Sequence, residues 1–364
     1  MLSKKALIAM SGGVDSSVAA LLTKEKGYDC IGCTMKLYNS ENVDVCQLHT
    51  CCSLSDVEDA RSVAYKLGMP YYVFNFADEF KEKVIDKFIC YYECGLTPNP
   101  CVDCNRYMKF DKLYNRAKVL GCDYIVTGHY AIIDFDGKKY HLRKAKDDTK
   151  DQSYVLYTMT QDQLAHTMFP LGKLTKIQTR KIASENGFVN SLKPDSQDIC
   201  FVPDGDYAAV IEKYTNKKSK SGDFVDTNGN KIGTHKGIIN YTIGQRKGLG
   251  ISSKMPLYVC GIDKEKNQVV LGHSDDLLET TLFVKDFSWV SGEIVTQPLE
   301  CCVKIRYRQK EQPAKLIPQE NGTVKIVFNS PQRAITPGQI AVAYKGDEVL
   351  GGGVIMKKGE NYVI

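Results

Sequence analysis

The first 130 residues alternate between short apolar runs and amphipathic segments, and this alternation constrains the fold more than any other feature. The predicted strands are residues 6–10, 30–36, 71–76 and 124–127, and the predicted helices between them are residues 14–26, 55–67 and 77–90. Strands that alternate with helices favour an α/β fold with a doubly wound parallel sheet, in which ligands bind beyond the carboxyl ends of the strands. The loops that follow these strands are therefore the first candidates for a site.

The pattern changes after about Asp204. Short β-rich runs are then separated by the sequences DTNGNK, GQRKGLG, DKEKNQ and QENG, which are typical of hairpin turns. From Phe283 onward, alternating apolar and polar residues indicate a closed or nearly closed β-barrel. The 364 residues therefore predict three domains: an α/β domain over residues 1–205, a small β-rich central module over 206–280, and a C-terminal β-barrel over 281–364.

The composition limits where the protein works. No run approaches 18 consecutive apolar residues, which excludes a membrane span, and the first residues lack the apolar core of a signal peptide. We therefore expect a cytoplasmic protein whose 14 cysteines are reduced thiols. The net charge of +5 lies in residues 206–364, while residues 138–181 are locally basic. Such charge fits a polyanionic partner, but solvated lysines on a helix face would look the same.

The strongest local motif is SGGVDSS, residues 11–17, between the first predicted strand and the first predicted helix. Glycines let backbone N–H groups approach an anion, and the helix N-terminus and serine hydroxyls add favourable charge and donors. The motif lacks the GK[ST] ending of a Walker loop, so transfer of a γ-phosphate with a loop lysine is not expected. SGGxDS resembles the loop of ATP pyrophosphatases, which cleave ATP between its α- and β-phosphates and adenylate a carbonyl oxygen.

Two further segments carry cysteines in suggestive contexts. In TPNPCVDCN, residues 97–105, two prolines predict a rigid loop that holds Cys101 and Cys104 just before a helix beginning near Asn105. A thiol at a helix N-terminus has a lowered pKa and is a better nucleophile. Alone, this CxxC equally fits half of a zinc site, a redox pair or coincidence. In PDSQDICFV, residues 194–202, Cys200 precedes an apolar pair that is typical of a buried strand.

The motifs taken together resemble one family. The ordered set is SGGVDSS, TMKLY, NPxxxCNxxxKF, TGHY, KDQSYVLY, DSQDICF, NYTIGQRKGLG and RYR. Over essentially the whole chain these are similar to the tRNA-uridine 2-sulfurtransferases, also called tRNA-specific 2-thiouridylases. The resemblance implies an ATP pyrophosphatase that replaces the 2-oxygen of uridine by sulfur at wobble position 34 of Lys, Glu and Gln tRNAs.

The resemblance also implies roles for individual residues. ATP, with Mg²⁺ to shield its phosphates, would be bound by Ala9, Met10, Ser11, Gly12, Gly13, Val14, Asp15, Ser16, Met35 and Gly128. Cys200 would carry the sulfur as a persulfide supplied by a cysteine desulfurase or a sulfur-carrier protein. Cys104 would be the partner nucleophile, and release of sulfur would leave a Cys104–Cys200 disulfide.

The implied tRNA contacts are Asn99, Pro100, Cys101, His129, Lys150, Asp151, Gln152, Arg306, Tyr307 and Gln339. Base extraction and phosphate binding need such residues. Simpler explanations exist for several of them. His129 also fits a satisfied histidine at a strand end, and Arg306 and Gln339 also fit solvent-facing positions.

One departure from the family leaves an alternative open. Many members have Asp where this chain has Cys101. With three thiols, Cys101, Cys104 and Cys200 could ligate a [4Fe–4S] cluster whose fourth iron binds hydrosulfide directly, in place of the persulfide relay. A separate pattern, formed by Cys46, His49, Cys51 and Cys52, resembles a zinc site, but its spacings are tight for a tetrahedral site and we favour an unliganded loop.

Two other classes of function compete with tRNA thiolation. A small-molecule ATP pyrophosphatase, such as an amidating ligase, would share SGGVDSS but has no use for two spaced reactive cysteines. An RNA-binding module without catalysis would explain the charge but not the adenylating loop. AMP release that depends on unmodified tRNA distinguishes the three.

Overall fold

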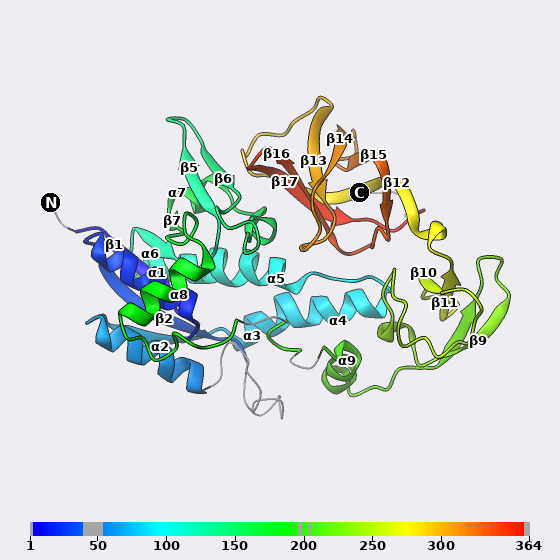
Figure 1. Cartoon of the computed structure of the whole chain (residues 1–364), viewed down its shortest axis with the longest axis horizontal. Helices are drawn as coiled ribbons and strands as arrows, with labels where there is room; N and C mark the ends of the chain where they lie inside the picture. The colour runs from blue at the N-terminus through cyan, green and yellow to red at the C-terminus, as the bar shows by residue number, and fades with distance from the viewer. Residues whose placement is uncertain (1–2, 39–53, 196–198, 203–204, 360–364) are drawn as a thin grey trace.

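The N-terminal part of the computed structural model is a five-stranded parallel sheet, which confirms the predicted α/β fold (Figure 1). The structure describes residues 3–38, 54–195, 199–202 and 205–359. The sheet has the order β3-β2-β1-β4-β7. Its strands are β1 (Lys5–Ala9), β2 (Asp29–Lys36), β3 (Tyr71–Asn75), β4 (Tyr124–Val126) and β7 (Thr167–Met168).

Helices cover both faces of this sheet because successive residues of each buried strand point to opposite sides. Ala6 and Ile8 of β1 pack in a core cluster with one group of helices, whereas Leu7 packs in a cluster with the other group. The first group is α1 (Val14–Glu25), α2 (Leu54–Lys66) and α8 (Lys176–Glu185). The second is α3 (Ala77–Phe80), η2 (Lys81–Ile85), α4 (Asp86–Glu93), α5 (Pro100–Asp103), η3 (Cys104–Leu113) and α6 (Tyr114–Val119).

The second group differs from the prediction at two points. The predicted helix 77–90 continues to Glu93 and contains the π-helical segment η2. The helix predicted to begin near Asn105 begins at Pro100 instead, because proline at the first helical position lacks only an N–H that needs no partner there. Cys101 and Cys104 are therefore helical, and the predicted rigid loop before the helix is wrong.

The central module holds the helix α9 (Tyr207–Thr215) and a four-stranded sheet of order β10-β11-β8-β9. The strands are β8 (Gly222–Val225), β9 (Lys231–His235), β10 (Tyr258–Asp263) and β11 (Gln268–Gly272), and the short helix η5 (Ile238–Asn240) follows β9. DTNGNK and DKEKNQ connect antiparallel neighbours, as predicted. GQRKGLG does not, because it lies between β9 and β10, which are opposite edges of the sheet.

The C-terminal part is a closed antiparallel barrel, which confirms the last element of the predicted fold class. Its strand β12 pairs with both β15 and β17, and this double pairing closes the ring. The strands are β12 (Leu278–Trp289), β13 (Leu299–Lys304), β14 (Gln312–Pro318), β15 (Val324–Arg333), β16 (Ile340–Lys345) and β17 (Glu348–Ile355), with η6 (Asp275–Leu277) before β12. QENG forms the predicted hairpin between β14 and β15.

The α/β part contributes two strands to the sheet of the barrel. The hairpin of β5 (Ile132–Phe135) and β6 (Tyr140–Arg143) extends the barrel sheet through the pairing of Arg143 with Glu348 of β17. The short helices η4 (Ser153–Leu156) and α7 (Gln161–Ala165) follow this hairpin. A strict domain boundary at residue 205 therefore misses a structural connection between the first and last parts of the chain.

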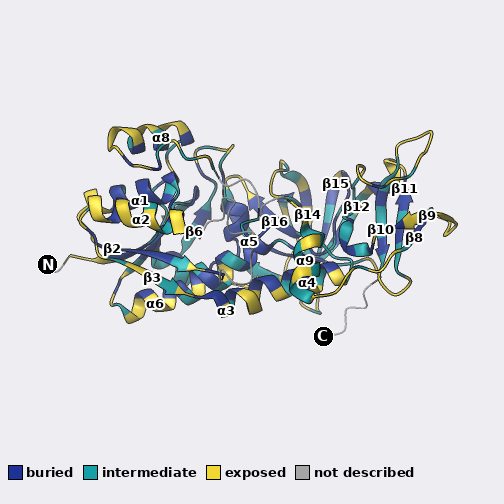
Figure 2. Cartoon of the chain, turned by 90° about the horizontal axis from the view of Figure 1, so that it is seen from below, coloured by how far each residue is buried: buried dark blue, intermediate teal, exposed yellow. Residues whose placement is uncertain are grey.

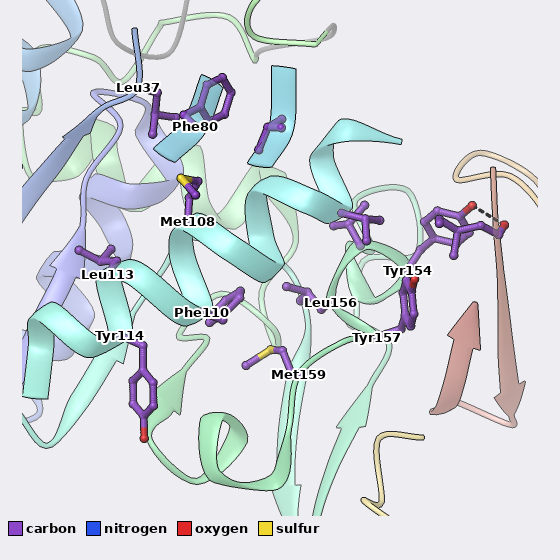
Figure 3. Close-up of a cluster of buried hydrophobic side chains, with 14 of the residues drawn as sticks. Leu37, Phe80, Met108, Phe110, Leu113, Tyr114, Tyr154, Leu156, Tyr157 and Met159 are labelled. Atoms are coloured by element: carbon purple, nitrogen blue, oxygen red, sulfur yellow. Dashed lines mark hydrogen bonds between the residues drawn. The ribbon is translucent and has the colours of Figure 1, made fainter. Parts of the chain in front are cut away.

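A continuous apolar core reaches from the parallel sheet to the barrel. Figure 3 shows this cluster running from Leu37 and Phe80 through Phe110 to Tyr154 and Tyr157, which lie beside the barrel strands. Figure 2 shows α2 and α8 with their outer sides exposed and the strands between the helix layers buried. Among the residues that the structure describes, every helix is too short or too polar to cross a bilayer.

Candidate active site at the sheet edge and the cysteine helix

The strand order places the SGGVDSS loop where doubly wound sheets bind ligands. The chain leaves β1 toward β2 and β3 on one side, and later adds β4 and β7 on the other side. β1 pairs in parallel with β4, so the loop after β1 and residues 127–128 after β4 flank the point where the strand order reverses. Ligands bind at this switch point because the loops on its two sides diverge.

Two glycines allow the loop to pack closely against its surroundings. Gly12 has φ of +75°, and a Cβ atom there would lie 2.3 Å from the carbonyl oxygen of Asp56. At Gly128, a Cβ atom would lie 2.8 Å from the backbone nitrogen of Ser16. The first turn of α1 is thus held between α2 and the end of β4, and any side chain at either glycine would displace it.

Hydrogen bonds fix the loop from inside. The Ser16 hydroxyl donates to the Gly13 carbonyl at 3.0 Å and accepts from the Ser11 N–H at 3.2 Å. The Asn190 amide nitrogen donates to the Gly12 carbonyl and to the Ser17 hydroxyl, both at 2.9 Å. The sequence analysis missed Asn190, whose side chain is 2% exposed and which lies too far along the chain for any local pattern to connect it with the loop.

The residues predicted to bind ATP therefore differ in what they can offer. Ser11 is exposed, and Ala9, Gly13, Asp15, Met35 and Gly128 are half-buried. Met10, Val14 and Ser16 are at most 5% exposed, so a ligand would meet their backbone rather than their side chains. Because Gly13 caps α1 without a side chain, the first backbone N–H groups of the helix remain available to an anion.

A network of charged side chains connects this loop with the segment that leads to Cys200. The Lys176 ammonium lies 2.7 Å from a carboxylate oxygen of Asp15 and 2.8 Å from one of Asp195. Lys150 and Arg180 also pair with Asp195, at 2.8 and 2.7 Å. Burial alone would raise the pKa of Asp195, but the hydrogen bonds from Lys150 and Lys176 outweigh it and lower that pKa to about 2.

Three members of this network, Lys176, Arg180 and Asp195, were absent from the predicted site. Their only sequence signal was the locally basic stretch over residues 138–181, which does not tell a solvated lysine from a buried one. Lys176 is 9% exposed, and the hydroxyl of Tyr130, in TGHY, donates to Asp15 at 2.9 Å. The network therefore joins three of the recognised motifs to the nucleotide loop.

The helix that carries Cys101 and Cys104 begins with a side-chain cap. The Asn99 side-chain oxygen accepts from the Val102 N–H at 3.4 Å, and Pro100 occupies the first turn. Cys101 lies in that first turn and is exposed, whereas Cys104 lies one turn further and is half-buried. The favourable effect of a helix N-terminus falls off within the first turn, so it acts on Cys101 and not, as predicted, on Cys104.

Cys200 is held by the apolar pair that follows it. The Phe201 ring packs edge-on against Phe80 and Phe88, with centroids 5.8 and 5.1 Å away, and Val202 is 1% exposed. These residues are not in a strand, so the strand-like reading of the pair is wrong although its burial is confirmed. Cys104 and Cys200 both pack against the same core cluster, and both thiols are reduced in this structure.

Several predicted tRNA contacts have partners within the protein. His129 is 6% exposed and lies 2.7 Å from the Thr127 hydroxyl and 3.3 Å from the Lys109 ammonium. Burial, with a smaller effect of Lys109, lowers the pKa of His129 well below its ordinary value. A buried neutral imidazole does not attract a phosphate, so the structure favours the satisfied histidine over the RNA contact.

The KDQ motif connects other motifs. Lys150 pairs with Asp195, and the buried Asp151 accepts from the N–H groups of Ala145 and Ser153. The Gln152 side-chain oxygen accepts from the Tyr130 N–H at 2.9 Å. Lys150 remains half-buried and can reach solvent, whereas Asp151 has its oxygens directed into the protein.

The barrel residues predicted to bind tRNA are also divided. Arg306 donates to the Ala334 carbonyl at 2.9 Å and to the Thr336 hydroxyl at 3.1 Å, and burial lowers its pKa. Gln339 donates to two carbonyl oxygens in residues 97–98. Tyr307 is 38% exposed and packs edge-on against Tyr154, so it alone of the three presents its ring to solvent.

Comparison with known proteins decides the family. Three models match successive parts: the tRNA methyl transferase HUP domain over residues 4–204, the tRNA methyl transferase PRC-barrel domain over 208–273, and the aminomethyltransferase beta-barrel domain over 279–355. The tRNA-specific 2-thiouridylase MnmA of Clostridioides difficile is 52% identical over 359 residues, covering 98% of this chain and 99% of that protein. The chain belongs to the tRNA-specific 2-thiouridylase family.

Other 2-thiouridylases match equally fully. The MnmA protein of Acetivibrio thermocellus is 51% identical over 98% of this chain and its own entire length, and that of Clostridium acetobutylicum is 51% identical over 97% of this chain. Such coverage means that the sheet, the central module and the barrel all belong to the 2-thiouridylase pattern. The resemblance inferred from the motifs is confirmed.

The candidate metal sites of this 2-thiouridylase were also compared with the structure. Among the described residues, no group of three His, Cys, Asp or Glu side chains converges as a metal site. Cys101, Cys104 and Cys200 are described and therefore do not form the ligand set that a [4Fe–4S] cluster needs in this arrangement. Cys46, His49, Cys51 and Cys52 lie outside the described residues.

Proposed function

We propose that this chain is an ATP-dependent tRNA 2-thiouridylase, which adenylates the 2-oxygen of uridine 34 in Lys, Glu and Gln tRNAs and replaces it by sulfur. One observation carries the proposal: the network Asp15–Lys176–Asp195 joins the nucleotide loop to the segment of Cys200. Adenylation and sulfur delivery must act on the same carbon, so the parts that perform them need a fixed relation. The network supplies such a relation.

The nucleotide step uses the loop at the end of β1. Backbone N–H groups at the start of α1 would bind the phosphates of ATP, with Ser11, Gly12 and Gly13 forming the turn and Met35 and Gly128 beside it. ATP would arrive as its magnesium complex, because magnesium keeps several waters and is commonly bound through substrate phosphates. Transfer of AMP to the uridine oxygen releases diphosphate and makes that oxygen part of a leaving group.

The sulfur step then uses the two cysteines. The terminal sulfur of a Cys200 persulfide attacks C2, and the C2–O bond breaks as AMP leaves. The Cys104 thiolate next attacks the Cys200 sulfur, and the electron pair of the broken S–S bond goes to the sulfur on C2. The products are 2-thiouridine and a Cys104–Cys200 disulfide, which a thiol reductant returns to two thiols.

The persulfide is favoured over the cluster by the placement of the three thiols, which do not converge as a ligand set. The persulfide itself would come from a cysteine desulfurase or a sulfur-carrier protein. Because tRNA and ATP are substrates, we propose that the protein works in the cytoplasm. We also propose domain limits of 1–205, 206–280 and 281–364, with the β5–β6 hairpin as a bridge to the barrel.

For tRNA binding we retain the residues with accessible atoms. Asn99 is half-buried, and Cys101 and Tyr307 are exposed, so they are proposed to meet the target base, with buried Pro100 shaping the turn. Lys150 is proposed to contact a phosphate. Asp151, Gln152, His129 and Arg306 are proposed to support the site from within.

The names of the matching models raise a second candidate, since two of them mention methyl transfer to tRNA. The curated relatives that are about half identical over nearly the whole chain are instead named 2-thiouridylases. An adenylating loop and two spaced thiols serve sulfur insertion and have no part in simple methyl transfer, so we favour thiolation.

The test is an assay with ATP, unmodified tRNA and a persulfide donor. We expect 2-thiouridine and AMP from the wild type, and loss of 2-thiouridine with Cys104→Ser and with Cys200→Ser. Retained thiolation by Cys200→Ser contradicts the persulfide route. Loss of activity with Cys101→Asp, together with stoichiometric iron and sulfide in the anaerobically purified wild type, would instead support the cluster.

A further inference from the structure

A turn of the barrel lies directly against the residues that lead into the cysteine helix. We define this barrel turn as Pro337–Gln339, between β15 and β16. The Thr97 N–H donates to the Pro337 carbonyl at 2.9 Å. The Gln339 amide nitrogen donates to the carbonyls of Thr97 at 3.0 Å and of Pro98 at 2.9 Å. Three hydrogen bonds therefore join the barrel turn to a segment more than two hundred residues earlier.

The approach of the two segments is close enough to require glycine. Gly338 has φ of +89°, and a Cβ atom there would lie 2.9 Å from the Thr97 nitrogen. Any other residue would push the barrel turn away from Thr97. The backbone of the barrel turn is therefore shaped to fit against residues 97–98.

The carbonyls that Gln339 binds belong to a segment with few other means of support. Pro98 and Pro100 have no N–H group and cannot join a β-ladder through their nitrogens. Residues 97–99 lie in neither a helix nor a strand. A side-chain donor is therefore the available means of fixing this approach to α5, and both N–H groups of the Gln339 amide serve it.

Packing alone does not hold α5 against the barrel. A cavity of about 230 Å³ lies between them, with Asn99, Val102 and Asp103 on the helix side and Gly338 and Ile340 on the barrel side. Unfilled space leaves neighbouring atoms without partners on one side, so dispersion contacts across it are weak. The hydrogen bonds at the edge of the cavity then decide where α5 lies.

We propose that Gln339 is a positioning residue for Cys104. It holds the Thr97 and Pro98 carbonyls and thereby fixes the start of the helix that carries the thiol, and it does so without touching RNA. This inference rests on the proposed role of Cys104 as the nucleophile of thiolation. It assigns the barrel a mechanical part in sulfur transfer, in place of the RNA contact expected for Gln339 from the motif.

The test compares three substitutions in the full-length protein. Gln339→Met keeps the length of the side chain but removes both donors, and Gln339→Glu also places a carboxylate against two carbonyl oxygens. Gln319→Met is the matched control, because Gln319 likewise donates to two consecutive carbonyls, those of Ile317 and Pro318, but within the β14–β15 turn.

Two readouts separate positioning from RNA binding. The first is steady-state thiolation, as kcat and as KM for tRNA. The second is the rate at which iodoacetamide alkylates Cys104 without tRNA or ATP, divided by the rate for exposed Cys90 of the same protein and resolved by peptide fragmentation. Circular dichroism confirms folding of each variant.

We expect both Gln339 variants to lose about tenfold or more in kcat with KM for tRNA unchanged, because a misplaced reacting group costs rate rather than affinity. The half-buried Cys104 should become severalfold more reactive relative to Cys90 as α5 loosens, and Gln319→Met should change neither quantity. A raised KM with unchanged alkylation would show an RNA contact and overturn the proposal. If the wild type proves not to thiolate tRNA, the alkylation ratio still decides whether Gln339 fixes the helix, and an unchanged ratio refutes it.

Discussion

The nucleotide loop and the cysteine helix are held in place by different means. Buried charges, Lys176 with Asp15 and Asp195, hold the loop among elements of the parallel sheet. The start of the cysteine helix is held by neutral amide and hydroxyl bonds to the barrel, beside a cavity of about 230 Å³. Ion pairs weaken with protonation and salt, whereas neutral bonds to carbonyls do not. The two halves of one site should therefore respond to different perturbations.

The largest expected effect is at the loop itself. Gly12→Ala combines a positive φ of +75° with a Cβ atom 2.3 Å from the Asp56 carbonyl oxygen. We expect it to lower the free energy of unfolding by about 3 kcal/mol from the left-handed backbone and overpacking together, and to abolish tRNA-dependent AMP release. Gly27→Ala is the matched control, since its φ is +83° with no atom within 4 Å of the added Cβ. Equal losses in the two variants, measured by urea unfolding, would show that the contact with Asp56 is unimportant.

The next effect concerns the charges that join the loop to the Cys200 segment. Lys176→Met leaves Asp15 without its cation, and should cost about 2 kcal/mol, below the value for fully buried pairs because both carboxylates reach solvent. Thiolation should fall by more than adenylation of tRNA, because the Cys200 segment depends on Asp195. Lys181→Met, on the exposed face of the same helix, should change neither rate. A double-mutant cycle with Asp195→Asn that shows no coupling contradicts the network.

A smaller effect is expected at the junction with the barrel. The Tyr154 hydroxyl, fully buried, donates to the Ile340 carbonyl at 2.8 Å, the bond drawn in Figure 3. Tyr154→Phe removes the donor and leaves a buried carbonyl oxygen, so we expect a loss of about 1 kcal/mol in thermal unfolding. Tyr65→Phe, at a position 87% exposed, serves as the control. No difference between the two variants would remove Tyr154 from the account of the junction.

The smallest effect is a pH dependence at the β5–β6 hairpin. His141 lies 2.7 Å from Glu348 of the barrel and 3.0 Å from Asp136, and hydrogen bonds to these carboxylates raise its pKa. A raised pKa stabilises the folded state below the ordinary histidine range, and that contribution is lost as the pH rises through the folded value. Hydrogen exchange in β6 and β17 should therefore quicken as the pH rises, beyond the intrinsic dependence, and His141→Gln should remove the excess. An excess that survives in His141→Gln assigns it to another group.

The sequence predicted the parallel sheet and the loop, because both follow from local patterns. The apolar run before SGGVDSS and the helical spacing after it depend only on neighbouring residues, and the structure has both within one residue of the expected limits. The barrel followed from alternation and turns in the same way. Its closure through β12 and β17 and the added β5–β6 hairpin did not, because strand pairing between distant segments leaves no local mark.

The candidate site was predictable only where one residue type carries the chemistry. Cys104 and Cys200 stood out by type and motif, and the start of their helix was misplaced because Pro100 was read as a breaker rather than as the first helical residue. Asn190 and Lys176 were missed since their function depends on burial against a distant loop. Gln339 was recognised as part of a motif, but its partners at Thr97 and Pro98 appear only in three dimensions.

The central claim is that one site adenylates tRNA and then transfers sulfur between Cys200 and Cys104. A single-turnover reaction tests it most directly: enzyme loaded with persulfide on Cys200 is mixed with ATP and unmodified tRNA, without added donor or reductant. The account predicts one 2-thiouridine and one Cys104–Cys200 disulfide for each AMP released. Thiolation that proceeds with both thiols still reduced at the end, or AMP release without tRNA, would contradict it.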